Sequence, residues 1–172
     1  LSTGLTAITS KDSDVPITIT GSIAMTSSTR MGLLNNVLGA TSGDVTIPMT
    51  LDSAEVTNFK NNVTDTNTAT NKLTITISGS LTTNAQVTNL RIIADRVNNN
   101  VQANIDGSGL TYAQLNTALA GSGAYGGTQN DIRMIGAPSD QSSASSSDKT
   151  NLTNSFDALS TESFNSATGL ST

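Results

Sequence analysis

Hydrophobic and polar residues alternate in five short segments of the chain, and each segment predicts a β-strand with one covered face. The clearest segment contains Leu73, Ile75 and Ile77, which alternate with threonines. Pro48 removes one backbone donor from the second segment, so that strand needs an edge or a bulge at this point. A glycine followed by a small residue is expected to end three of the strands. The expected strands cover residues 15–20, 45–49, 73–77, 101–105 and 132–135.

Apolar residues at helical spacing follow the strands and predict helices between them. The first helix is expected over 27–38, and the next three begin after Asp52, Thr83 and Thr111. Each of these three residues precedes a Glu or Gln by three positions, which predicts a capping box. A serine-rich segment, 142–147, is expected to be mobile. A final short helix is predicted from the spacing of Leu152, Phe156 and Leu159, with Phe164 packed nearby.

The strands recur at a regular spacing, which predicts repeated units. Strand starts fall every 28 residues, at Ile17, Val45, Leu73 and Val101. Strands joined by helices are usually parallel, and alternating strands favour helices on one face only. We therefore predict an α/β fold of strand–helix units of about 28 residues, with a mostly parallel, solenoid-like sheet covered on one face by helices. The alternative is that threonine alternation arises by chance in this composition.

This period divides the chain into three parts. Residues 1–14 are expected to be a lead-in segment, and residues 15–137 a strand–helix repeat domain. Its units are 15–72 and 73–131, with a partial third copy from 132. Residues 138–172 are expected to close this partial copy with a serine-rich loop and a helix. Because the chain begins at Leu1, we expect a processed product, a core or an excised segment.

Composition excludes several kinds of chemistry. The 172 residues include no Cys and no His, which excludes thiol chemistry and removes the commonest general base. Net charge is −5 and the eight Lys and Arg are scattered, so nucleic-acid binding is not expected. No apolar run approaches the roughly 20 residues that a membrane-spanning helix needs, so membrane insertion is not expected.

The strands and caps resemble a known kind of protein. The strand sequences I-T-I-T-G-S (17–22) and L-T-I-T-I-S-G-S (73–80), followed by T-N-A-Q-V-T-N-L (83–90), are similar to the strand–helix repeats of large bacterial secreted surface proteins. Such repeats occur in cyanobacterial giant exoproteins, adhesins and S-layer-type proteins. The resemblance covers about residues 15–137. It implies export, self-association or adhesion, and often calcium binding.

Calcium is the most plausible ligand because hard oxygen donors are abundant. The candidates are Asp12 and Asp14 in one turn, and Asn104, Asp106 and Ser108 in the segment N-I-D-G-S-G. The second segment imitates the middle of an EF-hand loop. However, Gln102 and Ala113 stand where acidic ligands are needed. The alternative interpretation is that these Asp, Asn and Gly residues serve turn geometry.

No group of residues indicates catalysis. Asp52 and Glu55 form a carboxylate pair, but a capping box explains it. The glycines of 121–127 are not followed by the lysine of a phosphate-binding loop, and the serine-rich segment has no nearby base. Tyr112 and Tyr125 are candidates for stacking on a sugar.

We therefore expect a non-enzymatic extracellular structural protein. In this interpretation it is a self-assembling subunit of a cell-surface filament or surface layer, or a repeat of a large adhesin, and its partners are copies of itself or adjacent repeats. The alternative is a glycan- or surface-binding module of a secreted protein. The threonine-rich sheet face, or the loops near Tyr112 and Tyr125, would then bind the ligand.

Overall fold

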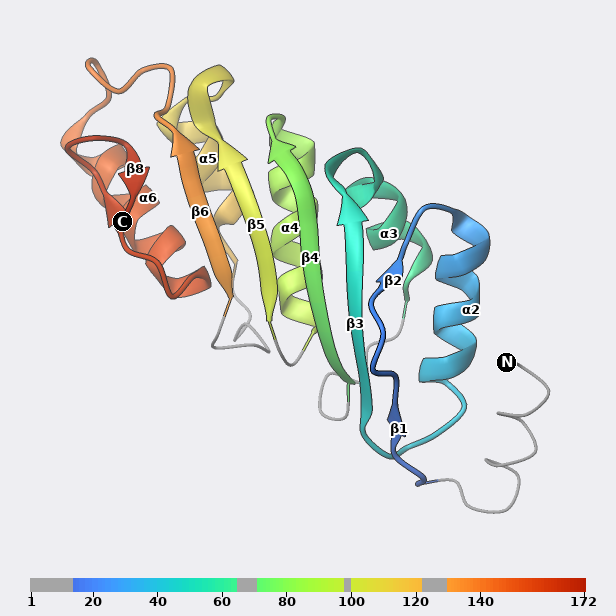
Figure 1. Cartoon of the computed structure of the whole chain (residues 1–172). Coiled ribbons are helices and arrows are strands. Elements are labelled where there is room, and N and C mark those ends of the chain that lie inside the picture. Colours follow the sequence, from blue (N-terminus) through green and yellow to red (C-terminus); the bar gives the residue numbers. More distant parts are fainter. Residues whose placement is uncertain (1–13, 65–70, 98–99, 122–129) are drawn as a thin grey trace.

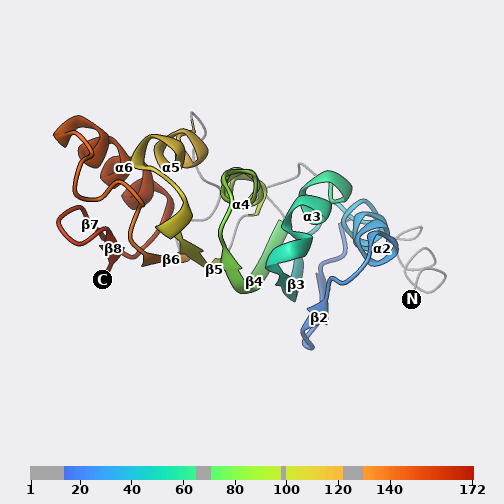
Figure 2. The ribbon, with the colours of Figure 1, turned by 90° about the horizontal axis from the view of Figure 1, so that it is seen from above.

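In the computed structural model the chain folds into a parallel sheet with helices packed on one face (Figures 1 and 2). The structure describes residues 14–64, 71–97, 100–121 and 130–172. The strands are β1 Ile17–Thr18, β2 Ile23–Ala24, β3 Val45–Asp52, β4 Asn71–Leu81, β5 Val101–Asp106, β6 Asp131–Gly136, β7 Phe164–Asn165 and β8 Leu170–Ser171. The α-helices are α2 Ser28–Leu38, α3 Val56–Asn62, α4 Asn84–Arg96, α5 Tyr112–Leu119 and α6 Ser146–Leu159, and η1 Ser53–Glu55 and η2 Gly107–Gly109 are 3-10 turns.

The strand order confirms the predicted α/β class. The main sheet has the order β1-β3-β4-β5-β6, and β2 also pairs with β3. Every pair in this sheet is parallel, whereas β7 and β8 form a small antiparallel pair. Helices connect successive long strands, which is the usual way to join parallel neighbours.

The core lies between the sheet and the helices. Along β3 and β5 buried residues alternate with more exposed ones, because successive side chains point to opposite faces. Ile75, Leu90 and Tyr112 have exposed fractions of 0%. Burial of each large aliphatic side chain contributes roughly 1.5–3 kcal/mol. Among the described residues no helix covers the opposite face of the sheet, which we call the open face (Figure 2).

Two of the three predicted capping boxes are confirmed. Thr83 and Thr111 each cap a helix, with Gln86 and Gln114 reaching back to complete the box. The box predicted at Asp52 is wrong. The Asp52 side chain accepts a hydrogen bond from Ala54 N at 2.9 Å, because a 3-10 turn rather than an α-helix begins there.

Of the three glycines expected to end strands, Gly136 ends β6 as predicted, and Gly21 lies between β1 and β2. The prediction is wrong for Gly79. β4 continues through Gly79, whose φ is +77°, to Leu81. Between Thr76 and Ser80 the chain advances four residues, whereas β5 advances two. The extra residues form a β-bulge, and the positive φ favours glycine. A register shift also places Gly136 opposite Asp106.

Pro48 lies in β3, beside the gap between β1 and β2. Thr46 and Thr50 accept hydrogen bonds from Ile19 N and Met25 N, so even-numbered residues of β3 face β1 and β2. From Thr18 to Ile23 the chain advances five residues against three along β3. β3 itself has no bulge at Pro48, so that part of the prediction is wrong. The irregularity lies in the neighbouring strand, between β1 and β2, and it interrupts the pairing of β3 at this point.

The predicted 28-residue solenoid is not confirmed. Paired residues are 28 positions apart between β1 and β3, but 26 apart between β3 and β4. They are 29 positions apart at the start of the β5–β6 pairing. The bulges change the register from pair to pair, and the sheet is open rather than closed into a solenoid.

The C-terminal segment differs from the expected mobile loop. Residues 140–143 form turns, and Ser145 caps α6 by accepting a hydrogen bond from Asp148 N at 3.1 Å. Leu152, Phe156 and Leu159 are buried, as predicted from their helical spacing. Phe164 packs against Phe156 with 5.7 Å between the ring centroids, which confirms the expected contact.

Candidate functional site

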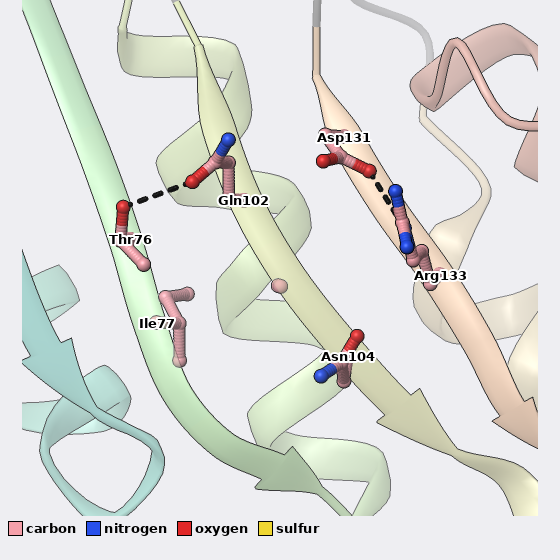
Figure 3. Close-up of a pocket in the computed structure, with 7 residues that line it drawn as sticks. Thr76, Ile77, Gln102, Asn104, Asp131 and Arg133 are labelled. Atoms are coloured by element: carbon pink, nitrogen blue, oxygen red, sulfur yellow. Dashed lines mark hydrogen bonds and ion pairs between the residues drawn. The ribbon is translucent and has the colours of Figure 1, made fainter.

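A shallow pocket of about 260 Å³ lies on the open face, over β4, β5 and β6 (Figure 3). We call it the open-face pocket. Five of its residues carry polar side chains, and the other two are aliphatic. The lining residues are Thr76, Ile77, Gln102, Ala103, Asn104, Asp131 and Arg133.

The position of the pocket follows from the bulge in β4. Thr76 pairs with Gln102 and Ser80 pairs with Asn104, while the residues between them lose regular pairing. Ile77 and Ala103 lie in this stretch, and their side chains are buried toward the helices. The stretch of irregular pairing between β4 and β5 therefore coincides with the pocket.

Polar side chains around the pocket come from alternate positions of β5 and β6. Gln102 and Asn104 point away from the helices because Val101, Ala103 and Ile105 pack against them. Thr76 Oγ1 donates to Gln102 Oε1 at 3.1 Å. Within the described part of the chain no residue bonds Gln102 Nε2 or the Asn104 side-chain amide. These amide groups are therefore available to a ligand.

Arg133 is held beside the pocket by two carboxylates. Its Nε donates to Asp131 Oδ1 at 3.0 Å, and its Nη2 lies 3.7 Å from Glu162 Oε1. The hydrogen bond to Asp131 and the charges of both carboxylates raise the pKa of Arg133. The guanidinium is about half exposed, so it can still donate to a ligand. The local charge is one cation against two anions, which does not favour an anionic ligand.

The predicted calcium residues are not all in one place. Asp12 lies outside the described residues, and Asp14 is exposed just before β1. Asn104 lines the open-face pocket. Asp106 ends β5 and accepts from Ser108 N at 3.0 Å, which lowers the pKa of the carboxyl.

This Asp106–Ser108 bond is the turn geometry given above as the alternative interpretation. Among the described residues no group of three or more acidic side chains could hold a metal ion. Calcium binding stays a prediction.

Tyr112 does not lie on the surface, where it was expected. Tyr112 has an exposed fraction of 0%, and its hydroxyl donates to Gln141 and to Ser166 O. Burial of the ring is the main cause that raises the pKa of Tyr112. It cannot stack on a sugar at the surface, so that prediction is wrong. Tyr125 lies outside the described residues.

Most residues of the pocket were not anticipated individually. In the sequence Gln102 counts against a calcium loop, and no local pattern singles out Asp131 or Arg133. The sequence feature that could have indicated them is the presence of polar residues at alternate positions of two neighbouring parallel strands. The sequence indicates Asn104, as a calcium candidate, and the threonine-rich sheet face, to which Thr76 belongs.

Comparison with family models, with curated proteins and with solved structures gives no match for this chain. In the part of the chain that the structure describes, no helix has the length and apolar character required to cross a membrane.

Proposed function

We propose that the chain is a non-enzymatic glycan-binding module of an extracellular protein, and that the open-face pocket receives a neutral sugar. The observation that carries the proposal is the pocket over the β4 bulge, walled by amide, hydroxyl and ion-paired side chains. Sugar hydroxyls both donate and accept, and Gln102 and Asn104 can do the same.

Charge and size favour a small neutral ligand. Asp131 and Glu162 balance Arg133, so an anionic sugar gains little from the guanidinium. The pocket volume of about 260 Å³ is below the usual range for drug-sized ligands, about 300–1,000 Å³, and suits a single sugar ring. Among the described residues no aromatic ring lines the pocket. We therefore expect weak binding, with a Kd on the order of 1 mM, or about −4 kcal/mol.

The same residues do not support catalysis. Hydrolysis without His or Cys would need a pair of carboxylates placed across a cleft. In the pocket the carboxylate Asp131 is bonded to Arg133, and the remaining polar groups are amides and a hydroxyl. The polar side chains of the pocket are therefore suited to binding a sugar without reacting with it.

A glycan array probed with many copies of the chain on one labelled carrier tests this proposal, because multivalent display makes millimolar binding detectable. We expect neutral oligosaccharides to give signals that N104A weakens about five- to tenfold, since a lost ligand hydrogen bond costs about 1–1.5 kcal/mol. N154A is the matched control, because Asn154 is exposed on α6 away from the pocket. An array without signals, or equal loss in both variants, would contradict the proposal.

A second candidate is the self-assembling structural protein that the resemblance to secreted surface proteins implies. One observation favours it: within the described residues no strand pairs with the outer side of β1 and β2. An unpaired edge invites another chain. Negative-stain electron microscopy with calcium and after chelation tests this candidate. Ordered filaments or layers would support it, and their loss on chelation would indicate calcium at the contacts. Dispersed particles under both conditions would contradict it.

A further inference from the structure

Polar side chains from four neighbouring strands form one row across the open face. Thr50 on β3 pairs with Thr76 on β4. Thr76 pairs in turn with Gln102 on β5, which pairs with Asp131 on β6. Because paired residues of parallel strands point to the same face of a sheet, these four side chains lie side by side, and we call them the cross-strand row. Figure 3 shows the part of the row that lies on β4, β5 and β6.

The row continues one strand beyond the open-face pocket. The pocket is lined by residues of β4, β5 and β6, whereas Thr50 lies on β3. Met49 and Leu51 are buried against the helices, so the exposed Thr50 side chain points to the open face. Among the described residues no hydrogen bond occupies its hydroxyl. Ala24, which pairs with Thr50 from β2, is also exposed and carries only a methyl group, so no long side chain closes the row at this end.

The spacing of the row matches an extended sugar chain. Neighbouring strands lie about 4.8 Å apart, so the row presents one polar side chain at each such step. In a β-1,4-linked chain each ring advances by a similar length, and hydroxyls project from both edges of the chain. In an α-1,4-linked chain the rings coil instead, so successive rings leave the surface. The regular pairing of β3 with β4 over all of β3 keeps this spacing up to the pocket.

Charge and shape narrow the ligand further. Three residues of the row are uncharged, and the fourth, Asp131, bonds Arg133 at 3.0 Å. A neutral chain is therefore favoured over a charged one. Neighbouring strands rotate by about 20–25° relative to each other, so a flat crystalline surface loses contact across four strands. A single soluble chain can follow this twist by rotation about its glycosidic bonds.

We propose that the cross-strand row binds a linear, neutral, β-1,4-linked glycan, with one ring in the open-face pocket and the next ring over Thr50. The chain then runs across the strands, and Thr50 Oγ1 donates to or accepts from a hydroxyl of the second ring. The inference rests on the proposed glycan binding and adds the linkage class of the ligand and its direction. It assigns Thr50 to a subsite that a single sugar does not reach.

An NMR titration of the native chain with oligomers of one to four rings tests the linkage. The probes are β-1,4-linked oligomers of glucose, of mannose and of xylose, and α-1,4-linked oligomers of glucose. From one ring to three, affinity should rise about fivefold more in at least one β-1,4 series than in the α-1,4 series, since one further hydrogen bond to the ligand contributes about this factor. The α-1,4 series contains the same number of rings and so controls for the statistical gain. Equal rises in the two linkages, or binding of other neutral glycans but of none of the β-1,4 series, would overturn the inference alone.

The T50V variant tests the assigned subsite, because valine keeps the shape of threonine without the hydroxyl. The ratio of three-ring to one-ring affinity should fall about fivefold in T50V and stay unchanged in T18V, the matched control on β1. Thr18 is exposed on the same face but pairs with Thr46, outside the row. Equal ratios in the native chain and both variants would overturn the inference and leave the proposed function standing. A native chain whose Gln102 and Asn104 amide signals respond to no neutral glycan would overturn the proposed function itself, and the inference with it.

Discussion

Asn130 shows how a single buried side chain joins three elements. Its Oδ1 accepts from Val101 N at 3.0 Å, and its Nδ2 donates to Leu159 O at 3.1 Å. The side chain therefore connects the start of β5 with the end of α6, just before β6 begins. Its exposed fraction is 0%, so water does not replace these bonds when they are lost.

N130A is expected to lower the free energy of unfolding by roughly 2–4 kcal/mol, because one buried N–H and one buried C=O lose a partner. Urea unfolding followed by circular dichroism measures this change. N154A, on the exposed face of α6, should change stability by less than about 0.5 kcal/mol. Equal effects in the two variants would show that the Asn130 bonds contribute little.

Ionisation of the Asp95 carboxyl lowers the free energy of unfolding, so this loss of stability depends on pH. Desolvation raises the pKa of its carboxyl, although the charge of Arg91 at 3.0 Å lowers it. Within the described residues nothing bonds Asp95 Oδ1. Because the folded pKa lies above the unfolded value of about 3.9, the cost is absent below that value and grows as pH rises through the folded pKa.

D95N should therefore be more stable than the native chain at neutral pH, and this advantage should disappear as pH falls below about 4. The urea midpoint measured across pH checks this expectation. A constant difference between the two chains would mean that the carboxyl does not titrate differently in the folded state.

At the scale of elements, local signals predicted more than long-range ones. The boxes at Thr83 and Thr111 depend on residues three positions apart, so the sequence carries them directly. The role of Gly79 depends on how β5 pairs with β4, which no local pattern encodes. From the local sequence alone, Gly79 is therefore expected to end the strand.

Replacement of Gly79 and of Gly21 by alanine should affect stability differently, because of the two only Gly79 has a positive φ. G79A should cost roughly 1–2 kcal/mol, because φ is +77° and a Cβ would meet Ser53 Oγ at 2.9 Å. G21A should be close to neutral, since a Cβ there meets nothing within 4 Å and φ is not positive. Thermal unfolding of the two variants compares them. Equal losses would contradict the assignment of strain to Gly79.

At the scale of the whole molecule, alternation along the strands correctly predicted a parallel sheet with helices on one face. The predicted regular spacing of 28 residues is not found, because bulges shift the pairing by different amounts along the sheet. The open-face pocket could not be predicted, since it needs the register of β4, β5 and β6 together. The sequence does show that Gln102, Asn104 and Arg133 are polar residues that alternate with apolar ones, which predicts that they point to the open face.

The most direct test of the glycan proposal is an NMR titration of the native chain with the best neutral oligosaccharide from the array. Side-chain amide signals of Gln102 and Asn104 are expected to shift together and saturate with a Kd on the order of 1 mM. Those of Asn36 and Asn154, exposed on α2 and α6, should stay in place. Shifts confined to the helices, or no saturable shift at Gln102 and Asn104, would contradict binding at the open face.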